Sequence, residues 1–256
     1  MGTLFDLSNK VALITGSTKG IGKAIAEQFA LMGAKVVISS RNADACERVA
    51  AEINEQTAES SATPIPCNIS EKSALTALVA QTKSLVGEID ILVCNAAVNP
   101  FYGSLADIPD SAFEKVLDVN VRSNHWLCQL VLPDMVARQS GSIIIVSSIA
   151  ALKGSNVLGA YGLSKAADVA LVKNLAVEYG PDNIRVNAIL PGLIRTDFAK
   201  ALWENPDVLR QRTAGEPLRR IGEPIEIAGA AVFLAADAAS FMTGQTIVID
   251  GGATIA

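Results

Sequence analysis

The sequence contains almost no histidine, and it lacks basic runs, long apolar runs and low-complexity linkers. His125 is the only histidine, so a histidine-based zinc site or a serine–histidine–aspartate triad would depend on that one residue. It stands beside Trp126 in the middle of a predicted helix. We therefore interpret His125 as a packed or surface helix residue.

Charge and hydropathy exclude further classes of protein. The net charge is −5 and no stretch is basic, which disfavours nucleic acid and anionic membrane surfaces as partners. The apolar runs are far shorter than a membrane span. Residues 1–10 lack the basic start and apolar centre of a signal peptide, and the last residues form no recognisable targeting tag. We expect a cytoplasmic protein with no membrane attachment.

The four cysteines, at positions 46, 67, 94 and 128, are not spaced as metal ligands, so no metal site is predicted. Cys67 and Cys94 lie in strand-like runs, where buried thiols are usual, and a reducing compartment fits them best. Hydrophobic residues make up 50% of the 256 residues, and composition does not change along the chain. Residues 1–256 are therefore expected to form one domain with a sizeable core.

Short apolar runs alternate with helical patterns along the whole chain. The expected strands are residues 10–15, 34–40, 62–69, 90–97, 142–148, 184–190 and 245–250, and the longer expected helices include 43–58, 71–86, 111–138, 159–179 and 224–236. This order predicts an α/β fold with a mostly parallel sheet and helices on both faces. The prolines of the third run indicate a strand near the sheet edge.

A glycine-rich turn follows the first expected strand and precedes a helix that ends at Gly33. It reads Gly16, Ser17, Thr18, Lys19, Gly20, Ile21 and Gly22. Glycines let a backbone approach a pyrophosphate, and the helix N-terminus supplies free N–H groups. Three glycines alone could form only a tight turn, but the strand and the helix around them favour a dinucleotide site.

The end of the second strand indicates which dinucleotide binds. Ser40 and Arg41 stand where an acidic residue would bind the 2′-hydroxyl of NAD, and Lys19 adds a second cation. The combination suits a 2′-phosphate and predicts NADP(H), although each charge alone could be an ordinary surface charge. Other strand ends supply further candidate cofactor contacts: Asn68, Ile69, Asn95, Ala96, Ala97, Pro191, Gly192, Ile194 and Thr196.

Tyr161 and Lys165 are four residues apart and therefore share one face of a helix. A nearby cation lowers the pKa of a phenol from about 10, so the phenol can exchange a proton with a carbonyl or alcohol. Ser148 ends an expected strand and could hydrogen-bond the same oxygen. Asn120, in the apolar middle of a helix, needs partners and is a structural cap, a network member or a catalytic relay.

Several apolar residues are candidate walls of a substrate pocket, although each could equally belong to the core: Phe101, Tyr102, Val157, Leu158 and Trp203. Residues 193–215 include a helical segment of polar composition, which we interpret as a lid over a substrate.

Together these motifs resemble the classical short-chain dehydrogenases/reductases over nearly the whole chain. The resemblance rests on Thr15-Gly-Ser-Thr-Lys-Gly-Ile-Gly22, Asn95-Ala-Ala97, Asn120, Ser148, Tyr161-Gly-Leu-Ser-Lys165, Pro191-Gly192 and Thr196. It implies a Rossmann-type, doubly wound sheet of about seven parallel strands and reversible hydride transfer between a nicotinamide and an alcohol or carbonyl. It also implies a homotetramer.

The resemblance assigns roles as well. It makes Tyr161 the acid/base, while Lys165 tunes it and binds the nicotinamide ribose. Ser148 polarises the substrate oxygen, and Asn120 holds a water that links Lys165 to solvent. Two positions depart from the family pattern, since Ala97 replaces a glycine and Asn68 replaces an aspartate.

Within the family, the segments 39–42, 95–103, 145–151 and 191–196 resemble NADPH-dependent carbonyl reductases of the retinal/dicarbonyl-reducing type. That resemblance implies apolar or aromatic ketones, aldehydes or α-dicarbonyls as substrates, although this chain lacks the peroxisomal tail that the group often carries. Other candidates are a 3-oxoacyl-carrier-protein reductase, an alcohol-oxidising dehydrogenase and an NADP(H) sensor without turnover. Such a sensor usually loses the acid/base pair that this chain keeps.

Overall fold

Seven parallel strands form the centre of the molecule, in the spatial order β3-β2-β1-β4-β5-β6-β7. The structure is a computed structural model that describes residues 4–57 and 61–256. The strands are β1 (Val11–Thr15), β2 (Lys35–Ser39), β3 (Ala62–Pro64), β4 (Ile91–Cys94), β5 (Gly141–Val146), β6 (Ile184–Pro191) and β7 (Thr246–Ile249). Residues 1–3, at the start of the segment judged not to be a signal peptide, and the expected helix end at Ala58 lie outside the described residues.

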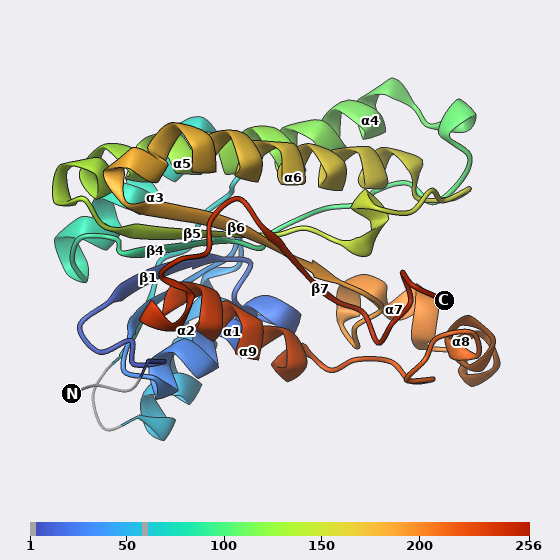
Figure 1. Ribbon diagram of the computed structural model, residues 1–256, viewed down its shortest axis with the longest axis horizontal. Coiled ribbons are helices and arrows are strands. Elements are labelled where there is room, and N and C mark those ends of the chain that lie inside the picture. The colour runs from blue at the N-terminus through green and yellow to red at the C-terminus, as the bar shows by residue number, and fades with distance from the viewer. Residues whose placement is uncertain (1–3, 58–60) are drawn as a thin grey trace.

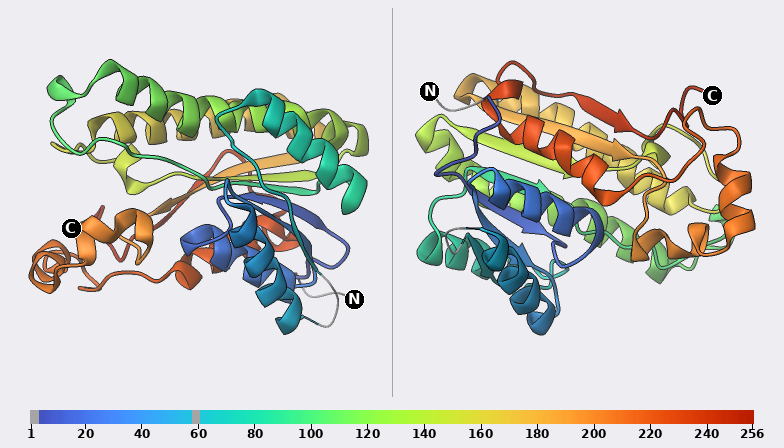
Figure 2. Two further views of the ribbon diagram at one scale, coloured as in Figure 1. Left: turned by 180° about the vertical axis from the view of Figure 1, so that it is seen from behind. Right: turned by 90° about the horizontal axis from the view of Figure 1, so that it is seen from below.

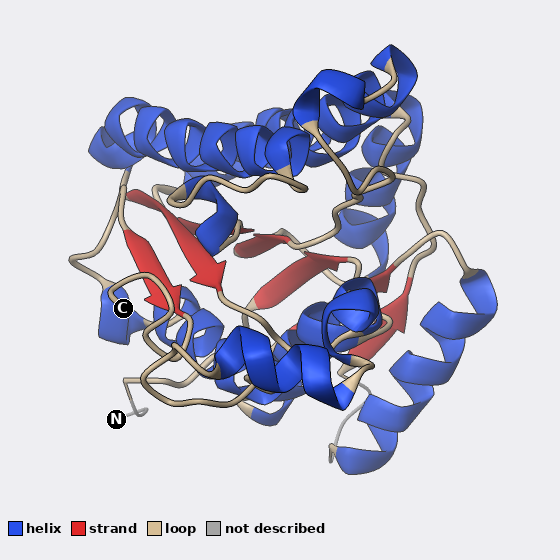
Figure 3. Cartoon of the chain, turned by 90° about the vertical axis from the view of Figure 1, so that its right-hand side faces the viewer, coloured by secondary structure: helices blue, strands red, loops and turns tan. Residues whose placement is uncertain are grey.

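Helices cover both faces of the sheet, as Figures 1 and 3 show. α3 (Lys72–Leu85), α5 (Ser123–Arg138) and α6 (Gly159–Tyr179) lie on one face. On the other face are α1 (Gly20–Leu31), α2 (Ala43–Gln56) and α9 (Pro224–Ala235), with α1 and α9 side by side in Figure 2. The predicted Rossmann-type, doubly wound single domain is confirmed.

Strand residues alternate between two hydrophobic cores because successive side chains point to opposite faces of a sheet. Ile14 and Val36 belong to the core under α1, α2 and α9. Leu13 and Val37 belong to the core under α3, α5 and α6. Both faces of these strands are therefore buried, which explains why the runs are continuously apolar rather than alternating.

The strand order reverses between β1 and β4, which are neighbours in the sheet. Ligands of doubly wound sheets bind in the crevice beyond the carboxyl ends of the strands at such a switch point. α4 (Asp110–Leu117) and the short helices α7 (Lys200–Trp203) and α8 (Pro206–Thr213) lie at this end of the sheet (Figure 1).

Most element bounds differ from the prediction by at most three residues, and two expected elements differ more. The third strand ends at Pro64 rather than at residue 69, because Pro64 and Pro66 have no N–H group to donate to a ladder. It does lie at the sheet edge, as predicted. The expected helix 111–138 is interrupted by a π-helical turn at Asp118–Arg122, which separates α4 from α5 and contains Asn120. Such turns occur frequently at functional sites.

Candidate active site

The glycine loop between β1 and α1 packs against the end of β4. The Asn95 amide nitrogen donates to the carbonyls of Thr15 and Gly16 at 3.0 and 3.1 Å. Gly16 has φ +66°, and a Cβ there would lie 2.9 Å from that amide nitrogen. A larger residue would therefore both strain the backbone and displace Asn95. This close packing brings the loop to the switch point between β1 and β4.

The N-terminus of α1 has the features of an anion site. Its first residue is Gly20, and the N-cap residue Lys19 makes no capping hydrogen bond with its side chain. The first N–H groups of a helix need such partners, and phosphate oxygens can supply them. The loop and this helix start therefore fit a dinucleotide pyrophosphate.

The residues predicted to read the adenosine phosphate lie at the end of β2. Arg41 is exposed, and the Ser40 hydroxyl accepts from the Asn42 N–H at 3.3 Å. Asn42 in turn caps α2 by accepting from the Ala45 N–H. Lys19 Nζ lies 3.3 Å from Asp197 Oδ2, where both side chains are mostly exposed. The arginine side chain is thus available at the surface, whereas the lysine already has a carboxylate partner.

The remaining candidate cofactor contacts also lie at strand ends. Asn68 makes local bonds with Glu71 and Ser70, and Ile69 is buried. Ala96 follows β4 and donates its N–H to the Thr15 hydroxyl at 3.2 Å. Ala96 thus lies next to the end of β1, whereas the contacts of Asn68 stay within its own turn.

The segment after β6 reaches the same crevice. Pro191 ends β6, and Ile194 is buried and forms a bridge with Gly222. Thr196 is the N-cap of a 3-10 turn, and a Cβ on Gly20 would lie 3.0 Å from its methyl group. This contact shows that the segment after β6 lies directly beside the glycine loop.

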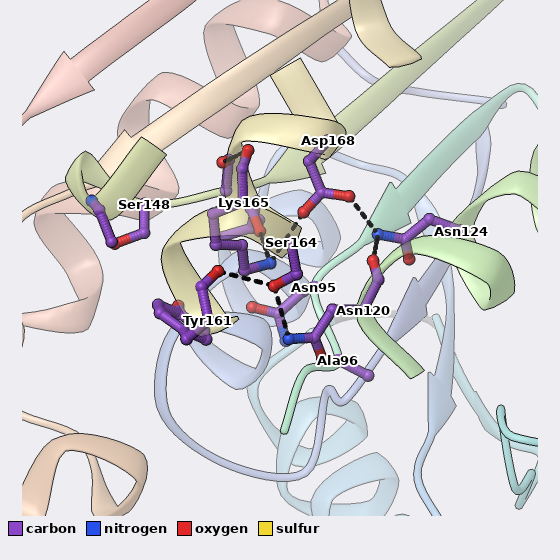
Figure 4. A network of polar contacts seen from close by, with 12 residues as sticks. Asn95, Ala96, Asn120, Asn124, Ser148, Tyr161, Ser164, Lys165 and Asp168 are labelled. Carbon is purple, nitrogen blue, oxygen red and sulfur yellow. Dashed lines mark hydrogen bonds and ion pairs between the residues drawn. The ribbon is translucent and has the colours of Figure 1, made fainter. Parts of the chain in front are cut away.

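Ser148, Tyr161 and Lys165 lie in one region of the site, where the segment after β5 packs against α6 (Figure 4). Ser148 lies two residues beyond β5, and its hydroxyl oxygen accepts from the Ala150 N–H at 3.1 Å. Its own hydrogen remains available to a substrate oxygen. Tyr161 and Lys165 lie on the first turns of α6, and Lys165 Nζ is 5.8 Å from the centroid of the tyrosine ring.

The Asn120 side chain is completely buried, and both its oxygen and its nitrogen make hydrogen bonds. Its side-chain oxygen accepts from the Val98 N–H at 2.8 Å, and its amide nitrogen donates to the Val98 carbonyl at 2.9 Å and to the Ser164 hydroxyl at 3.0 Å. Ser164 in turn donates to the Tyr161 carbonyl. Asn120 therefore connects the loop after β4 with the helix that carries Tyr161, which is a network role among the alternatives left open by the sequence.

The sequence interpretation overlooked two further members of this network, Asp168 and Asn124. Lys165 Nζ donates to Asp168 Oδ2 and to the Val146 carbonyl, both at 3.0 Å. Asn124 donates from its amide nitrogen to Asp168 Oδ1 at 3.0 Å and to the Asn120 carbonyl at 2.7 Å. An aspartate three residues after Lys165, in an otherwise apolar stretch of helix, was the signal that could have revealed them.

Burial and pairing act in opposite directions on this ion pair. Burial raises the pKa of the Asp168 carboxyl, and the Lys165 ammonium and the Asn124 amide oppose it only in part. At Lys165 burial is the strongest influence and lowers the pKa, but the attraction of Asp168 and Tyr161 together raises it overall. We take the pair as ionised, because each carboxylate oxygen accepts a hydrogen bond.

The predicted substrate residues come from two loops and from helix α7 at this end of the sheet. Gly103 donates to the Val157 carbonyl at 3.1 Å and pairs with Leu158, so the loop carrying Phe101 lies against the segment before α6. Trp203 donates from its indole nitrogen to the Thr196 carbonyl at 2.9 Å. Tyr102 is largely exposed.

Phe198, which the sequence interpretation missed, contacts the tyrosine. Its ring centroid lies 5.8 Å from that of Tyr161, although 54% of the side chain is exposed. The neighbouring Arg195 guanidinium lies 5.2 Å from the centroid of the Trp203 ring. The segment after β6 therefore supplies aromatic surface next to the predicted acid/base.

His125 is exposed on α5, and all four cysteines are buried and free. Among residues 4–57 and 61–256, histidine, cysteine, aspartate and glutamate side chains form no group of three or more that could hold a metal ion. No helix in the described part of the chain is both long and apolar enough to cross a membrane.

A family model described as enoyl-(acyl carrier protein) reductase matches residues 16–254, a span that runs from the glycine loop to the last turn of the chain. Dehydrogenase/reductase SDR family member 4 from Bos taurus is 46% identical over 246 residues, covering 96% of this chain and 88% of that protein. The chain belongs to the classical short-chain dehydrogenase/reductase family. As a member of this family it is an oxidoreductase.

Two solved family members show what such folds can hold. A 7α-hydroxysteroid dehydrogenase complexed with NADH and 7-oxo glycochenodeoxycholic acid is 39% identical, with a TM-score of 0.92 over 97% of this chain and 96% of that one. A gluconate 5-dehydrogenase from Burkholderia cenocepacia in complex with NADP and tartrate is 30% identical, with a TM-score of 0.93 over 99% and 98%. Both nicotinamide cofactors therefore occur among proteins of this fold.

Proposed function

We propose that this short-chain dehydrogenase/reductase transfers a hydride between NADP(H) and a carbonyl/alcohol pair, and that it reduces apolar or aromatic ketones, aldehydes or dicarbonyls. The observation that carries the proposal is the joint position of Ser148, Tyr161 and Lys165 in one region, where Figure 4 also shows Asn95, a residue that holds the glycine loop. A bound nicotinamide supplies or accepts the hydride. The protein supplies binding, orientation and the proton.

In the direction of reduction, the Ser148 hydroxyl donates a hydrogen bond to the carbonyl oxygen and Tyr161 gives that oxygen its proton. Lys165 stabilises the phenolate that remains, because its ammonium is held next to the ring. Asn120 keeps the loop after β4 and the tyrosine helix in one arrangement. In the direction of oxidation, Tyr161 removes the proton from the alcohol.

NADP(H) rather than NAD(H) is proposed from the end of β2. Arg41 is an exposed fork of donors next to the Ser40 hydroxyl, and no carboxylate occupies either position. Charge-assisted bonds from a guanidinium suit a 2′-phosphate. The ion pair of Lys19 with Asp197 is mostly exposed and therefore weak, so a phosphate can compete for that lysine.

An apolar substrate is proposed from the surface around Tyr161. Phe198 lies against the tyrosine ring. Phe101 lies on the loop that pairs with the segment of Val157 and Leu158 before α6, and Trp203 ends α7. We propose that residues 193–215, which include α7 and α8, act as a lid over this surface. An aromatic ketone would bury apolar area against these side chains at about 25 cal/mol per Å².

An acyl-carrier-linked substrate is the second candidate, because the matching family model carries that description. Such a substrate needs unpaired cations near the mouth of the site. Three candidate cations on residues 193–215 are each paired with a carboxylate, Arg195 with Glu223, Lys200 with Glu204 and Arg210 with Asp207. These pairs are exposed and therefore weak, so they do not distinguish a small-molecule carbonyl from a protein-bound acyl group, and a direct test of both substrates is needed.

The four free thiols support a cytoplasmic, reducing setting. The test of the activity is NADPH oxidation with a panel of aromatic ketones, aldehydes, α-dicarbonyls and a 3-oxoacyl thioester, in native protein and in Tyr161→Phe. We expect turnover with the apolar carbonyls and a loss of about 10²–10⁴-fold or more in Tyr161→Phe, with NADPH binding kept. Turnover confined to the thioester would favour the second candidate, and a fully active Phe variant would contradict the acid/base assignment.

A further inference from the structure

Lys165 and Asp168 form an ion pair with both side chains buried, at 2% and 0% exposure. In each of the other ion pairs among the described residues, both side chains are more than a quarter exposed. The two residues are one turn apart on α6, and Nζ lies 3.0 Å from Oδ2. A buried charge is costly unless it is paired and hydrogen-bonded. The presence of two buried charges on α6 therefore has to be explained by something other than the packing of this helix.

Position 168 belongs to the buried face of α6. Val172 and Leu175, one and two turns further along the same face, pack into the hydrophobic core. An apolar residue at position 168 would complete this stripe at no electrostatic cost. The chain instead carries a carboxylate there, and Asn124 on α5 carries an amide that donates to it at 3.0 Å. Two elements thus supply polar side chains to one buried point.

The pair fixes the orientation of the lysine. An ammonium has three N–H donors. The Val146 carbonyl accepts one and Asp168 accepts another. One donor is left for the tyrosine or a bound ligand. Without the carboxylate, the main-chain carbonyl of Val146 would be the sole described hydrogen-bond partner of this ammonium.

The pair also maintains the charge of the lysine. Burial alone would lower the pKa of Lys165, whereas Asp168 is the largest influence that raises it. The other titratable groups that act on the pair are Tyr161 and Cys94 of β4. The Cys94 thiol has its pKa raised well above its usual value, first by a hydrogen bond with Cys128 of α5, and is therefore neutral.

Charged residues on the other elements next to α6 either have partners elsewhere or are exposed to solvent. Asp118 and Arg122 of the π-helical turn pair with each other at partly exposed positions. Arg185 of β6 donates to the carbonyls at the end of α9. Asp182, beyond the end of α6, accepts from Gln139. The charged residues of α4 are exposed: Asp110, Glu114 and Lys115.

We propose that Asp168 is a positioning residue of the reaction, which together with Asn124 fixes the Lys165 ammonium beside Tyr161 and preserves its charge in the dry interior. The inference rests on the proposed function in so far as Lys165 serves the proton transfer. It predicts that replacing Asp168 lets Lys165 lose its proton at a pH where the native protein keeps it.

The substitution is Asp168→Asn, which keeps the shape and one acceptor but removes the charge. Asp182→Asn, in the 3-10 turn directly after the same helix, is the control for a change in net charge. The first measurement is kcat against pH with NADPH and the best carbonyl. Between about pH 7 and pH 9 we expect Asp168→Asn to lose at least about tenfold more activity than the native protein and the control.

The second measurement needs no turnover. A buried lysine with a lowered pKa binds fewer protons when folded than when unfolded, so its stability rises with pH. The difference in urea midpoint between Asp168→Asn and the native protein should therefore narrow from about pH 6 to about pH 8, below the main ionisation range of thiols. A purely structural role would give a difference that does not depend on pH.

Asn124→Ala provides a second route should Asp168→Asn fold poorly. It leaves the carboxylate in place but removes the amide that holds Oδ1, so it should shift the kcat profile in the same direction by less. The double variant Asp168→Asn/Asn124→Ala should lose less activity than the two single losses added together, because the two residues act as one unit.

The outcomes separate the two claims. Suppose that the native enzyme is active. The role of Asp168 alone is then overturned if the differences in kcat and in urea midpoint between variant and native protein do not depend on pH. It is also overturned if Asp168→Asn and Asn124→Ala both leave the kcat–pH profile unchanged. A native protein without turnover on any carbonyl overturns the proposed function, and the urea measurement then decides separately whether Asp168 preserves the charge of Lys165.

Discussion

Lys19 and Asp197 join the glycine loop to the segment after β6, with Nζ 3.3 Å from Oδ2. The two residues are 178 positions apart in the sequence, and both side chains are more than two-thirds exposed. The pair spans the crevice at the carboxyl ends of the strands. Lys19, which we assign to the 2′-phosphate of NADP(H), is therefore already bound to a carboxylate in this structure.

Asp197→Asn should release Lys19 and strengthen NADPH binding. The gain should be up to about fivefold, because exposed ion pairs are worth about 0–1 kcal/mol. NADH, which has no 2′-phosphate, should gain less. Fluorescence titration of both cofactors measures the effect, with Asp207→Asn as a control in the neighbouring exposed pair with Arg210. Equal gains for NADPH and NADH would show that Lys19 does not read the phosphate.

The double substitution Ser40→Asp/Arg41→Ala should reverse the cofactor preference. The native ratio of kcat/KM for NADPH over NADH should be well above one, because a charge-assisted bond is worth about 1.5–3 kcal/mol. The new aspartate should repel the phosphate and bind a ribose diol. A native preference for NADH, or a ratio that the double change leaves in place, would contradict the assignment of these residues.

Asn120→Ala should reduce both stability and turnover. The substitution leaves the N–H and carbonyl of Val98 without their partner and should lower the free energy of unfolding by about 2–3 kcal/mol. The loop after β4 should then no longer be held against α6. Urea unfolding measures the stability, and Asn174→Ala, an exposed asparagine of α6, should stay within about 0.5 kcal/mol of native.

The dependence of stability on acidic pH should report the ion pair between Arg220 and Glu226 at the start of α9. The Arg220 side chain and the Glu223 N–H lower the pKa of Glu226 to about 2. A carboxyl with a lowered pKa stabilises the fold above its unfolded value, 4.5, and loses that contribution as pH falls towards 2. Glu226→Gln should therefore be less stable than native at neutral pH, and the gap should narrow below pH 4.5. If the difference in stability between Glu226→Gln and native protein stays equally large as the pH falls, the ion pair with Arg220 is not the cause of that difference.

We predict a homotetramer from the apolar residues left exposed by this fold. Val177 on the outer face of α6 is 81% exposed, and Phe241 and Ile255 near the C-terminus are almost completely exposed. Light scattering at micromolar concentration should give four chains, and Phe241→Lys or Val177→Lys should reduce that number. Leu85→Lys, on α3, tests whether any added charge has the same effect. A native monomer would contradict the prediction.

The sequence by itself was sufficient to predict the fold, which is confirmed, and to nominate four catalytic positions. Local spacing was sufficient there, because a strand, a glycine turn and a helix specify a phosphate site within one short segment. In the same way, Tyr161 and Lys165 share a helical face by their spacing alone. Both the family and the Rossmann-type sheet followed from such short-range patterns.

Tertiary structure alone decided which distant residues surround that site. Asn124 and Asp168 are 44 positions apart and meet only because α5 and α6 pack on the same face of the sheet. Phe198 reaches Tyr161 because the segment after β6 folds back over the strand ends. Side-chain contacts between separate elements depend on how those elements pack, and no local pattern in one sequence encodes that packing. The sequence therefore predicted Tyr161 and Lys165 as the acid/base pair, and the fold revealed the buried carboxylate of Asp168 beside Lys165.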